Sequence, residues 1–158
     1  MVRYIETNEL VAGKMGIAYI QIDDERYELA NLKELTAQID YDIATEKRLG
    51  KVLNMHKVVG GDGTGTATFF FNTSTFRKFG ERFKDSGKYF YFNIVIVNND
   101  PSTNIGEQQI ILKDCCFKTN VLAKLDVSGT EALTETADFF FDDYHIETEF
   151  TTDYKEKA

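Results

Sequence analysis

The sequence predicts a single, mainly β domain over residues 1–158, an antiparallel β-sandwich or barrel with one flanking α-helix. Apolar and polar residues alternate in several segments, and this is the period of a strand that buries one face. Residues 72–87 change to the period of a helix. The expected strands do not alternate regularly with helices, which argues against a parallel βαβ fold. A chain of 158 residues with thirteen Phe and eight Tyr can bury a stable core without disulfide bonds or a structural metal ion.

The N-terminal third is expected to consist of strands. Residues 15–32 alternate on both sides of a polar turn at residues 23–26, which predicts a hairpin. Residues 32–43 show the strictest alternation and predict a long strand with one acidic face. The expected core side of this strand carries Leu35, Ile39 and Tyr41, and the polar side carries Glu34, Thr36, Gln38, Asp40 and Asp42.

A long loop is expected over residues 44–63, where the alternation stops. Connections longer than about 12 to 15 residues are uncommon in compact domains unless they are functional, disordered or linkers. This segment gathers the cations Lys47, Arg48, Lys51 and Lys57. Its glycine-rich end, GGDGTGT, lacks the Lys and the following helix of a phosphate-binding loop, so a tight turn or bulge is expected there.

A strand and then the predicted helix follow this loop. The strand presents Thr64, Thr66 and Thr68 on one side. The helix is expected to dock on the sheet through Phe76, Phe79 and Phe83, which share one face. Thr73 or Ser74 is a suitable N-cap, and Gly87 can take the positive φ that ends a helix.

Further strands are expected in the C-terminal half of the chain. The apolar run over residues 88–97 suits a strand that is covered on both sides. Strands are also expected within residues 107–119, 121–127 and 131–147. The last of these carries Thr134, Thr136 and Asp138 on its polar side, so three strands of the sequence offer polar faces that together could line a channel.

Catalytic, metal and nucleic-acid sites are not indicated by the sequence, and no cofactor is expected. His56 and His145 are the two histidines, and nothing places either beside a nucleophile or a carboxylate pair. The adjacent Cys115 and Cys116 would point to opposite faces of a strand, so we expect reduced, inert thiols. A net charge of -8 disfavours binding to phosphates. A signal peptide and a membrane anchor are not expected either.

The segments GTGTATFFF, STFRKF, ILKDCCF, AKLDVSGTEAL and FFFDDYHI occur in the order seen in PBSX-type phage tail tube proteins. The sequence resembles this family over most of the chain after about Lys33, and in type more than in residues over 1–31. The resemblance implies a structural subunit and no enzyme. Such subunits form hexameric rings that stack into a hollow tube inside a contractile sheath, with sheath, baseplate and tape-measure proteins as partners. It also implies a virion or phage-tail-like particle assembled in the bacterial cytoplasm.

In such a tube the polar strand faces would line the lumen, and the loop over residues 44–63 would reach the adjacent ring. An acidic, hydroxyl-rich wall gives passing DNA no hold through counterion release. The expected lumen wall comprises Glu34, Thr36, Gln38, Asp40, Asp42, Thr64, Thr66, Thr68, Thr134, Thr136 and Asp138.

Two alternatives remain open at this point. The same tube could belong to a headless, bacteriocin-like particle that conducts ions through a target envelope. From a different class, the chain could be a monomeric β-barrel that binds a small ligand or sugar.

Overall fold

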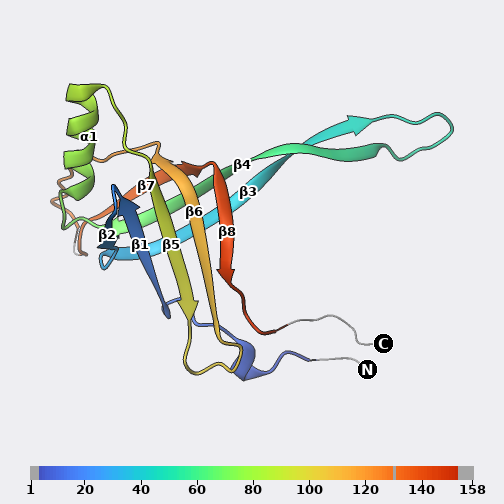
Figure 1. Ribbon diagram of the computed structural model, residues 1–158, viewed down its shortest axis with the longest axis horizontal. Coiled ribbons are helices and arrows are strands. Elements are labelled where there is room, and N and C mark those ends of the chain that lie inside the picture. Colours follow the sequence, from blue (N-terminus) through green and yellow to red (C-terminus); the bar gives the residue numbers. More distant parts are fainter. Residues whose placement is uncertain (1–3, 130, 153–158) are drawn as a thin grey trace. The chain divides into compact units, whose positions relative to one another are not determined.

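The computed structural model describes residues 4–129 and 131–152 and confirms the mainly antiparallel β class with a helix (Figure 1). The chain forms two compact units. Unit 1 combines the residues before Asn31 with Tyr91–Asp114 and the residues from Asp143 onwards. Unit 2 consists of Asn31–Phe90 and Cys115–Asp142. That the whole chain acts as a single domain stays a prediction.

Unit 1 contains a short 3-10 helix, Thr7–Glu9, and a small antiparallel sheet. Its strands are β1 (Gly16–Ile22), β2 (Glu25–Glu28), β5 (Phe92–Asn99), the first part of β6 (Glu107–Phe117) and β8 (Asp143–Thr148). β1 pairs with β2 and β5, and β6 pairs with β8.

The hairpin at the start of unit 1 is closed by a two-residue turn. Asp23 and Asp24 both have positive φ, 48° and 66°, and they link the paired residues Ile22 and Glu25. Positive φ at both central positions is typical of the type I′ turn, whose twist matches that of the flanking strands. The core of unit 1 is formed by Ala18, Ile20, Ile22, Ile94, Val95 and Leu112.

Unit 2 is built on a three-stranded antiparallel sheet. β3 (Leu32–Glu46) pairs with β4 (Met55–Phe70), and β4 pairs with β7 (Thr134–Phe141). The last residues of β6 pair with β7 at its far end, through Cys116 and Phe117. β3 therefore lies at one end of this strand order.

The expected loop over residues 44–63 is wrong in extent, because most of it belongs to strands. β3 continues to Glu46 and β4 begins at Met55, so residues 47–54 make the connection. β7 pairs with β4 from Gly63 onwards, and the outer part of the hairpin is therefore two-stranded (Figure 1). Both faces of a two-stranded arm are exposed to solvent, so its residues 44–46 and 55–62 need not alternate.

Two expectations for the C-terminal half also need correction. Residues 121–127 form no strand, and Leu122, Leu125 and Val127 are largely exposed. Asp126 instead accepts hydrogen bonds from the backbone N–H and the hydroxyl of Ser128, which makes a turn. The expected strand over residues 131–147 is divided into β7 and β8, which belong to different units.

The helix α1 spans Thr75–Ser86 and ends at Gly87, whose φ of 72° is the expected C-terminal stop. At its start, the Thr73 hydroxyl accepts a hydrogen bond from the N–H of Thr75 at 3.4 Å, and Ser74 makes no side-chain cap. No described side chain of α1 is fully buried, since the helix lies at the surface of unit 2.

The three phenylalanines of α1 differ in their contacts. The Phe76 ring packs against Phe69 and Phe117, with ring centroids 5.4 and 5.0 Å apart. Phe83 contacts Tyr89 but remains 44% exposed, so the expectation that Phe83 anchors the helix in the core is wrong. Phe79 is half-buried. An amphipathic pattern identifies the docking face of a helix but not how deeply each side chain on it is buried.

Candidate functional site

One face of the unit 2 sheet is mainly polar, although Phe70 and Phe140 also lie on it. The register of the sheet aligns Glu34 with Thr68, and Thr68 with Thr136, in one row across three strands. The next row joins Thr36, Thr66 and Asp138, and Gln38 pairs with Thr64. Because side chains alternate between the faces of a strand, all of the residues expected to line a lumen lie on this face. That they surround a lumen stays a prediction.

Hydrogen bonds between neighbouring strands and along β3 hold the side chains of this face in place. The Thr66 hydroxyl donates to Asp138 at 2.9 Å, and the hydroxyls of Thr68 and Thr136 lie 3.2 Å apart. Asp40 accepts hydrogen bonds from the Thr64 hydroxyl and from the Gln38 amide, at 3.2 and 3.0 Å. The threonines therefore bridge the strands and orient the neighbouring carboxylates.

The opposite face of the same sheet is apolar, and glycines of β4 let phenylalanine rings cover it. Gly65 pairs with Phe139 and Gly63 with Phe141. A Cβ atom at either glycine would overlap the ring of its partner. Neither glycine has positive φ, so the chain makes no tight turn there. The pairing of β3 with β4 does shift by one residue at the first glycine of GGDGTGT, from Asp42–Gly60 to Ile43–Val58, which fits the expected bulge. Gly63 and Gly65 make room for the two core rings.

The polar face also carries charged residues that the sequence reasoning missed. Asp62 pairs directly with Asp40, although like charges in opposed positions destabilise a sheet. The alternation from Thr64 backwards would have indicated Asp62. Lys118 also lies at this face, beside Asp138 and Phe140. The position of Lys118 depends on the pairing of β6 with β7, which local sequence patterns do not predict.

The outer arm of the β3–β4 hairpin is exposed on both sides. Tyr41 is 62% exposed, so the expectation that it enters the core is wrong, whereas Leu35 and Ile39 are half-buried. β3 continues past the part of the sheet that β7 covers, so the Tyr41 ring has no core to enter.

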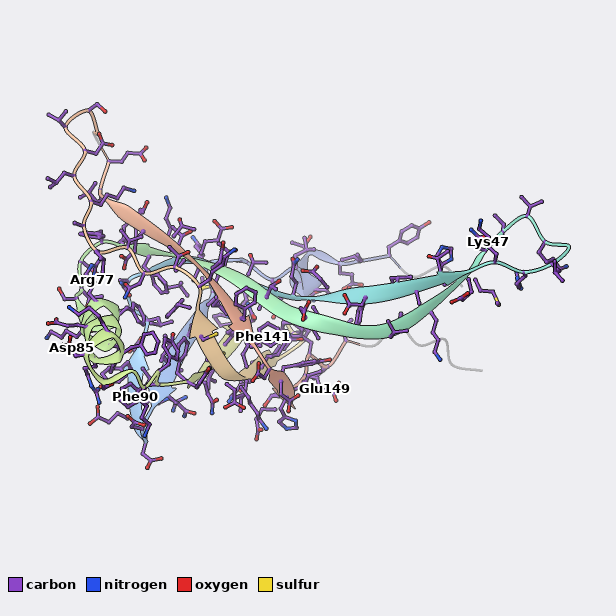
Figure 2. The ribbon with its side chains drawn as sticks, turned by 90° about the horizontal axis from the view of Figure 1, so that it is seen from above. Lys47, Arg77, Asp85, Phe90, Phe141 and Glu149 are labelled. Atoms are coloured by element: carbon purple, nitrogen blue, oxygen red, sulfur yellow. The ribbon has the colours of Figure 1, made fainter. Side chains whose placement is uncertain are left out.

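The tip of this arm, residues 47–54, is both basic and apolar. Lys47, Arg48 and Lys51 are exposed, and Lys47 lies far from α1 within unit 2 (Figure 2). Lys57, expected to be in the loop, is in β4 and pairs with Ala44. The apolar side chains of the tip, Leu49, Val52 and Leu53, are 103%, 97% and 76% exposed.

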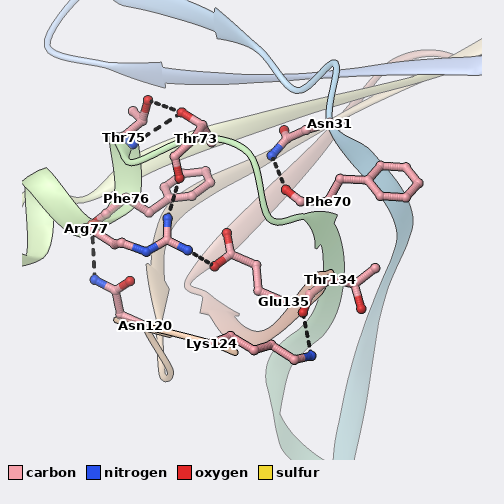
Figure 3. Close-up of polar contacts among 10 residues, drawn as sticks. All are labelled: Asn31, Phe70, Thr73, Thr75, Phe76, Arg77, Asn120, Lys124, Thr134 and Glu135. Carbon is pink, nitrogen blue, oxygen red and sulfur yellow. Dashed lines mark hydrogen bonds and ion pairs between the residues drawn. The ribbon is translucent and has the colours of Figure 1, made fainter. Parts of the chain in front are cut away.

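A buried ion pair fixes the start of α1 to the sheet of unit 2 (Figure 3). The Arg77 guanidinium donates to Glu135 at 2.5 Å and to the carbonyl of Thr73, and it stacks on Phe71. Burial raises the pKa of Glu135, and the Arg77 charge opposes this effect. Asn120 also bonds the Phe76 carbonyl of the helix.

The candidate catalytic groups are scattered. His56 pairs with Thr45 in the hairpin arm, and His145 lies in β8 with Glu147 at 3.5 Å. Burial raises the pKa of the Cys116 thiol, and Asp142 adds to the shift, so the thiol stays protonated and unreactive.

Within residues 4–129 and 131–152, no three His, Cys, Asp or Glu side chains converge as metal ligands. No helix in that part of the chain combines the length and the hydropathy needed to cross a membrane.

Two solved structures contain chains whose fold is similar to that of this chain. The chain resembles a chain in the anti-feeding prophage baseplate, with a TM-score of 0.68 at 12% identity, covering 87% of this chain and 95% of that one. It also resembles a chain in the PVC sheath–tube complex of an extracellular contractile injection system, with a TM-score of 0.57 at 11% identity, covering 84% and 88%. At these identities the likeness concerns the fold.

The sequence comparisons are more specific. The phage-like element PBSX protein XkdM of Bacillus subtilis (strain 168) is 31% identical over 142 residues, which is 90% of this chain and 93% of that protein. Residues 3–147 match the family described as phage tail tube protein. The chain belongs to the phage tail tube protein family, and it is a structural component of a phage tail or phage-tail-like particle rather than an enzyme.

Proposed function

We propose that the chain assembles into hexameric rings that stack into a hollow tube inside a contractile sheath. The observation that supports this most strongly is the register of β3, β4 and β7, which gathers the polar residues of three strands on one face. A strand with one polar and one apolar face suits a wall between a core and an aqueous lumen. Closing β3 against a neighbouring copy would also remove the open edge of this 15-residue strand.

The tube would serve as a conduit for DNA or ions through the envelope of a target cell. The polar face carries the carboxylates Glu34, Asp40, Asp42, Asp62 and Asp138. DNA binds proteins largely through cations that release its counterions, so this wall would let DNA pass without holding it. The tube would assemble in the host cytoplasm, with sheath, baseplate and tape-measure proteins as partners.

Stacking of the rings would use the tip of the β3–β4 hairpin. Its cations Lys47, Arg48 and Lys51 would approach acidic residues of the adjacent ring, and its apolar side chains would be buried there. The acidic residues near the C-terminal end, Asp142, Asp143, Glu147 and Glu149, are candidate partners. Charge pairs of this kind set register more than affinity, because each exposed pair contributes about 0 to 1 kcal/mol.

A tube of a headless, bacteriocin-like particle is a second candidate, because XkdM is itself described as part of a phage-like element. The genes beside this one distinguish the two, since capsid and terminase genes would indicate a complete phage. A monomeric ligand-binding barrel has less support, since the polar face of unit 2 is an open sheet surface rather than an enclosed site.

Negative-stain electron microscopy of the purified protein, combined with native mass spectrometry, tests the proposal. We expect hollow rings or tubes and a sixfold mass. The proposal of ring formation would be contradicted if the protein stayed monomeric under three conditions. These are high protein concentration, low salt, and incubation with preformed tube ends.

A further inference from the structure

Lys118 continues the polar face of unit 2 beyond β7. Cys116 pairs with Phe140 and Phe117 with Phe139, and the N–H of Lys118 donates to the carbonyl of Asp138 at 2.7 Å. The register is thus extended by one residue, and Lys118 stands beside Asp138 at the end of the row that begins with Thr36. Its side chain lines a hollow of about 310 Å³ with Thr66, Asp138 and Phe140.

Among the residues that the structure describes, none neutralises the ammonium group of Lys118. The neighbouring Asp138 carboxylate accepts the hydroxyl hydrogen bond from Thr66, on the side of β4 and away from β6. In the part of the chain that the structure describes, no carboxylate forms an ion pair with Lys118. Within unit 2, an exposed cation therefore remains at the side of the polar face where the end of β6 pairs with β7.

The other side of the unit 2 sheet, formed by β3, has the opposite charge. β3 ends the strand order there, and its polar face carries Glu34, Asp40 and Asp42. Asp40 is engaged by Thr64 and Gln38, whereas Glu34 and Asp42 make no side-chain hydrogen bond or ion pair with any described residue. When identical subunits are related by rotation in a ring, one edge of each meets the opposite edge of the next.

We propose that Lys118 of one copy forms an ion pair with the free carboxylates of β3 in the adjacent copy, and that this pair sets the register of the lateral contact. The side of the sheet that carries Lys118 thus contacts strand β3 of a second copy of the chain. This inference rests on the proposed ring and deepens it, because it specifies which two edges meet and which charges match.

The pairing also resolves a conflict within the proposed function. A Lys118 left free in every copy would place a circle of positive charge on a wall that must not hold DNA. A carboxylate from the next copy would neutralise it. Since a strand shifted by one residue turns its side chains to the other face, a charge pair at the edge would also disfavour the wrong register.

Charge reversal tests the pairing. Lys118→Glu is expected to keep the monomer folded, because the side chain is exposed, and to slow ring formation on the order of tenfold or more at low salt. Lys78→Glu, on the exposed side of α1, is the matched control and should assemble at the wild-type rate. Circular dichroism and thermal unfolding establish that each variant is folded.

A charge exchange makes the test specific. Glu34→Lys and Asp42→Lys are each combined with Lys118→Glu. The double variant that reverses the true partner should recover most of the wild-type rate of ring formation. The same carboxylate-to-lysine change by itself should impair assembly. Ring formation by Lys118→Glu at the wild-type rate would overturn the pairing and leave the ring itself intact. Absence of rings from the wild-type protein would instead overturn the proposed function.

A DNA-binding role for Lys118 is the opposing outcome. Assembled tubes are incubated with a fluorescent single-stranded oligonucleotide and sedimented. Retention by wild-type tubes that is lost in Lys118→Ala tubes would show that the ammonium group is free in the lumen, which contradicts the pairing. Equal, low retention by both is the result that the pairing predicts.

Discussion

Single residues decide which face of the unit 2 sheet becomes core. Ala67 and Phe139 are buried on the apolar side, while Thr66 and Asp138 beside them point the opposite way. The rings of Phe139 and Phe141 can lie flat across β4 because the opposed residues are glycines. Aromatic rings that cover glycines in this way are a known device for stabilising sheets.

Replacing Gly65 by Ala should destabilise unit 2, because the added methyl group would overlap the Phe139 ring. We expect the free energy of unfolding to fall by about 1 to 3 kcal/mol, the usual cost of overpacking a core. Chemical denaturation measures it. Gly60→Ala in the same strand is the control, since its nearest neighbour would be Asp42 Oδ2 at 3.5 Å. Equal stability of the two variants would refute this role of Gly65.

The hydrogen bonds of Asp100 predict that the stability of unit 1 depends on pH. The Ser102 hydroxyl, then the N–H groups of Ala12 and Ser102, donate to its carboxylate and lower its pKa. Because the pKa is lower in the folded state, ionised Asp100 stabilises the fold above the usual carboxyl pKa. This contribution is lost as the pH falls through the folded-state value.

Asp100→Asn should therefore be less stable than the wild type at neutral pH, and the difference should shrink as the medium is acidified. Unfolding followed between about pH 2 and 7 measures this difference. A difference that is constant over the whole range would show that ionisation of Asp100 does not contribute.

At the scale of elements, the aromatic and ionic contacts of α1 with the sheet of unit 2 lie in its first turn. Phe76 enters the aromatic cluster of unit 2, and Arg77 forms the buried pair with Glu135, while Phe83 at the other end stays partly exposed. An amphipathic pattern predicts the contact face of this helix. It cannot predict how deeply each turn of the helix is buried, which depends on where the sheet ends.

Phe76→Ala and Phe83→Ala test this unequal docking. The Phe76 variant should lose about 2 to 3 kcal/mol, somewhat less than the full value for a buried ring because Phe76 is half-buried. The Phe83 variant should lose about 1 kcal/mol, since its ring is 44% exposed. Guanidinium unfolding of both variants provides the comparison, and a larger loss for Phe83 would reverse the assignment.

Reversing Lys47, Arg48 and Lys51 to Glu should leave the protein folded and able to form rings, but slow the growth of tubes at low salt. The tip lies outside the core, so the change acts on contacts between copies. The matched control reverses the exposed Lys78, Lys84 and Lys88 near α1. Light scattering follows growth, and a triple variant that grows tubes at the wild-type rate would exclude electrostatic stacking by the tip.

At the scale of the whole molecule, alternation of polar and apolar residues predicts the β class, the helix and the polar face. Alternation does not predict where β3 ends or that β7 and β8 are separate strands. It also does not predict that Gly63 and Gly65 make room for phenylalanine rings. Each depends on a partner strand that is distant in the sequence. Lys118 was missed for the same reason, because its neighbour Asp138 lies on another strand.

A cryo-electron microscopy reconstruction of assembled tubes tests the central claim most directly. We expect Thr66 and Asp138 on the lumen wall, with Ala67 and Phe139 turned away from it into the subunit. A reconstruction in which the polar face of β3, β4 and β7 is turned outwards, or in which the chain forms no closed ring, would contradict the account.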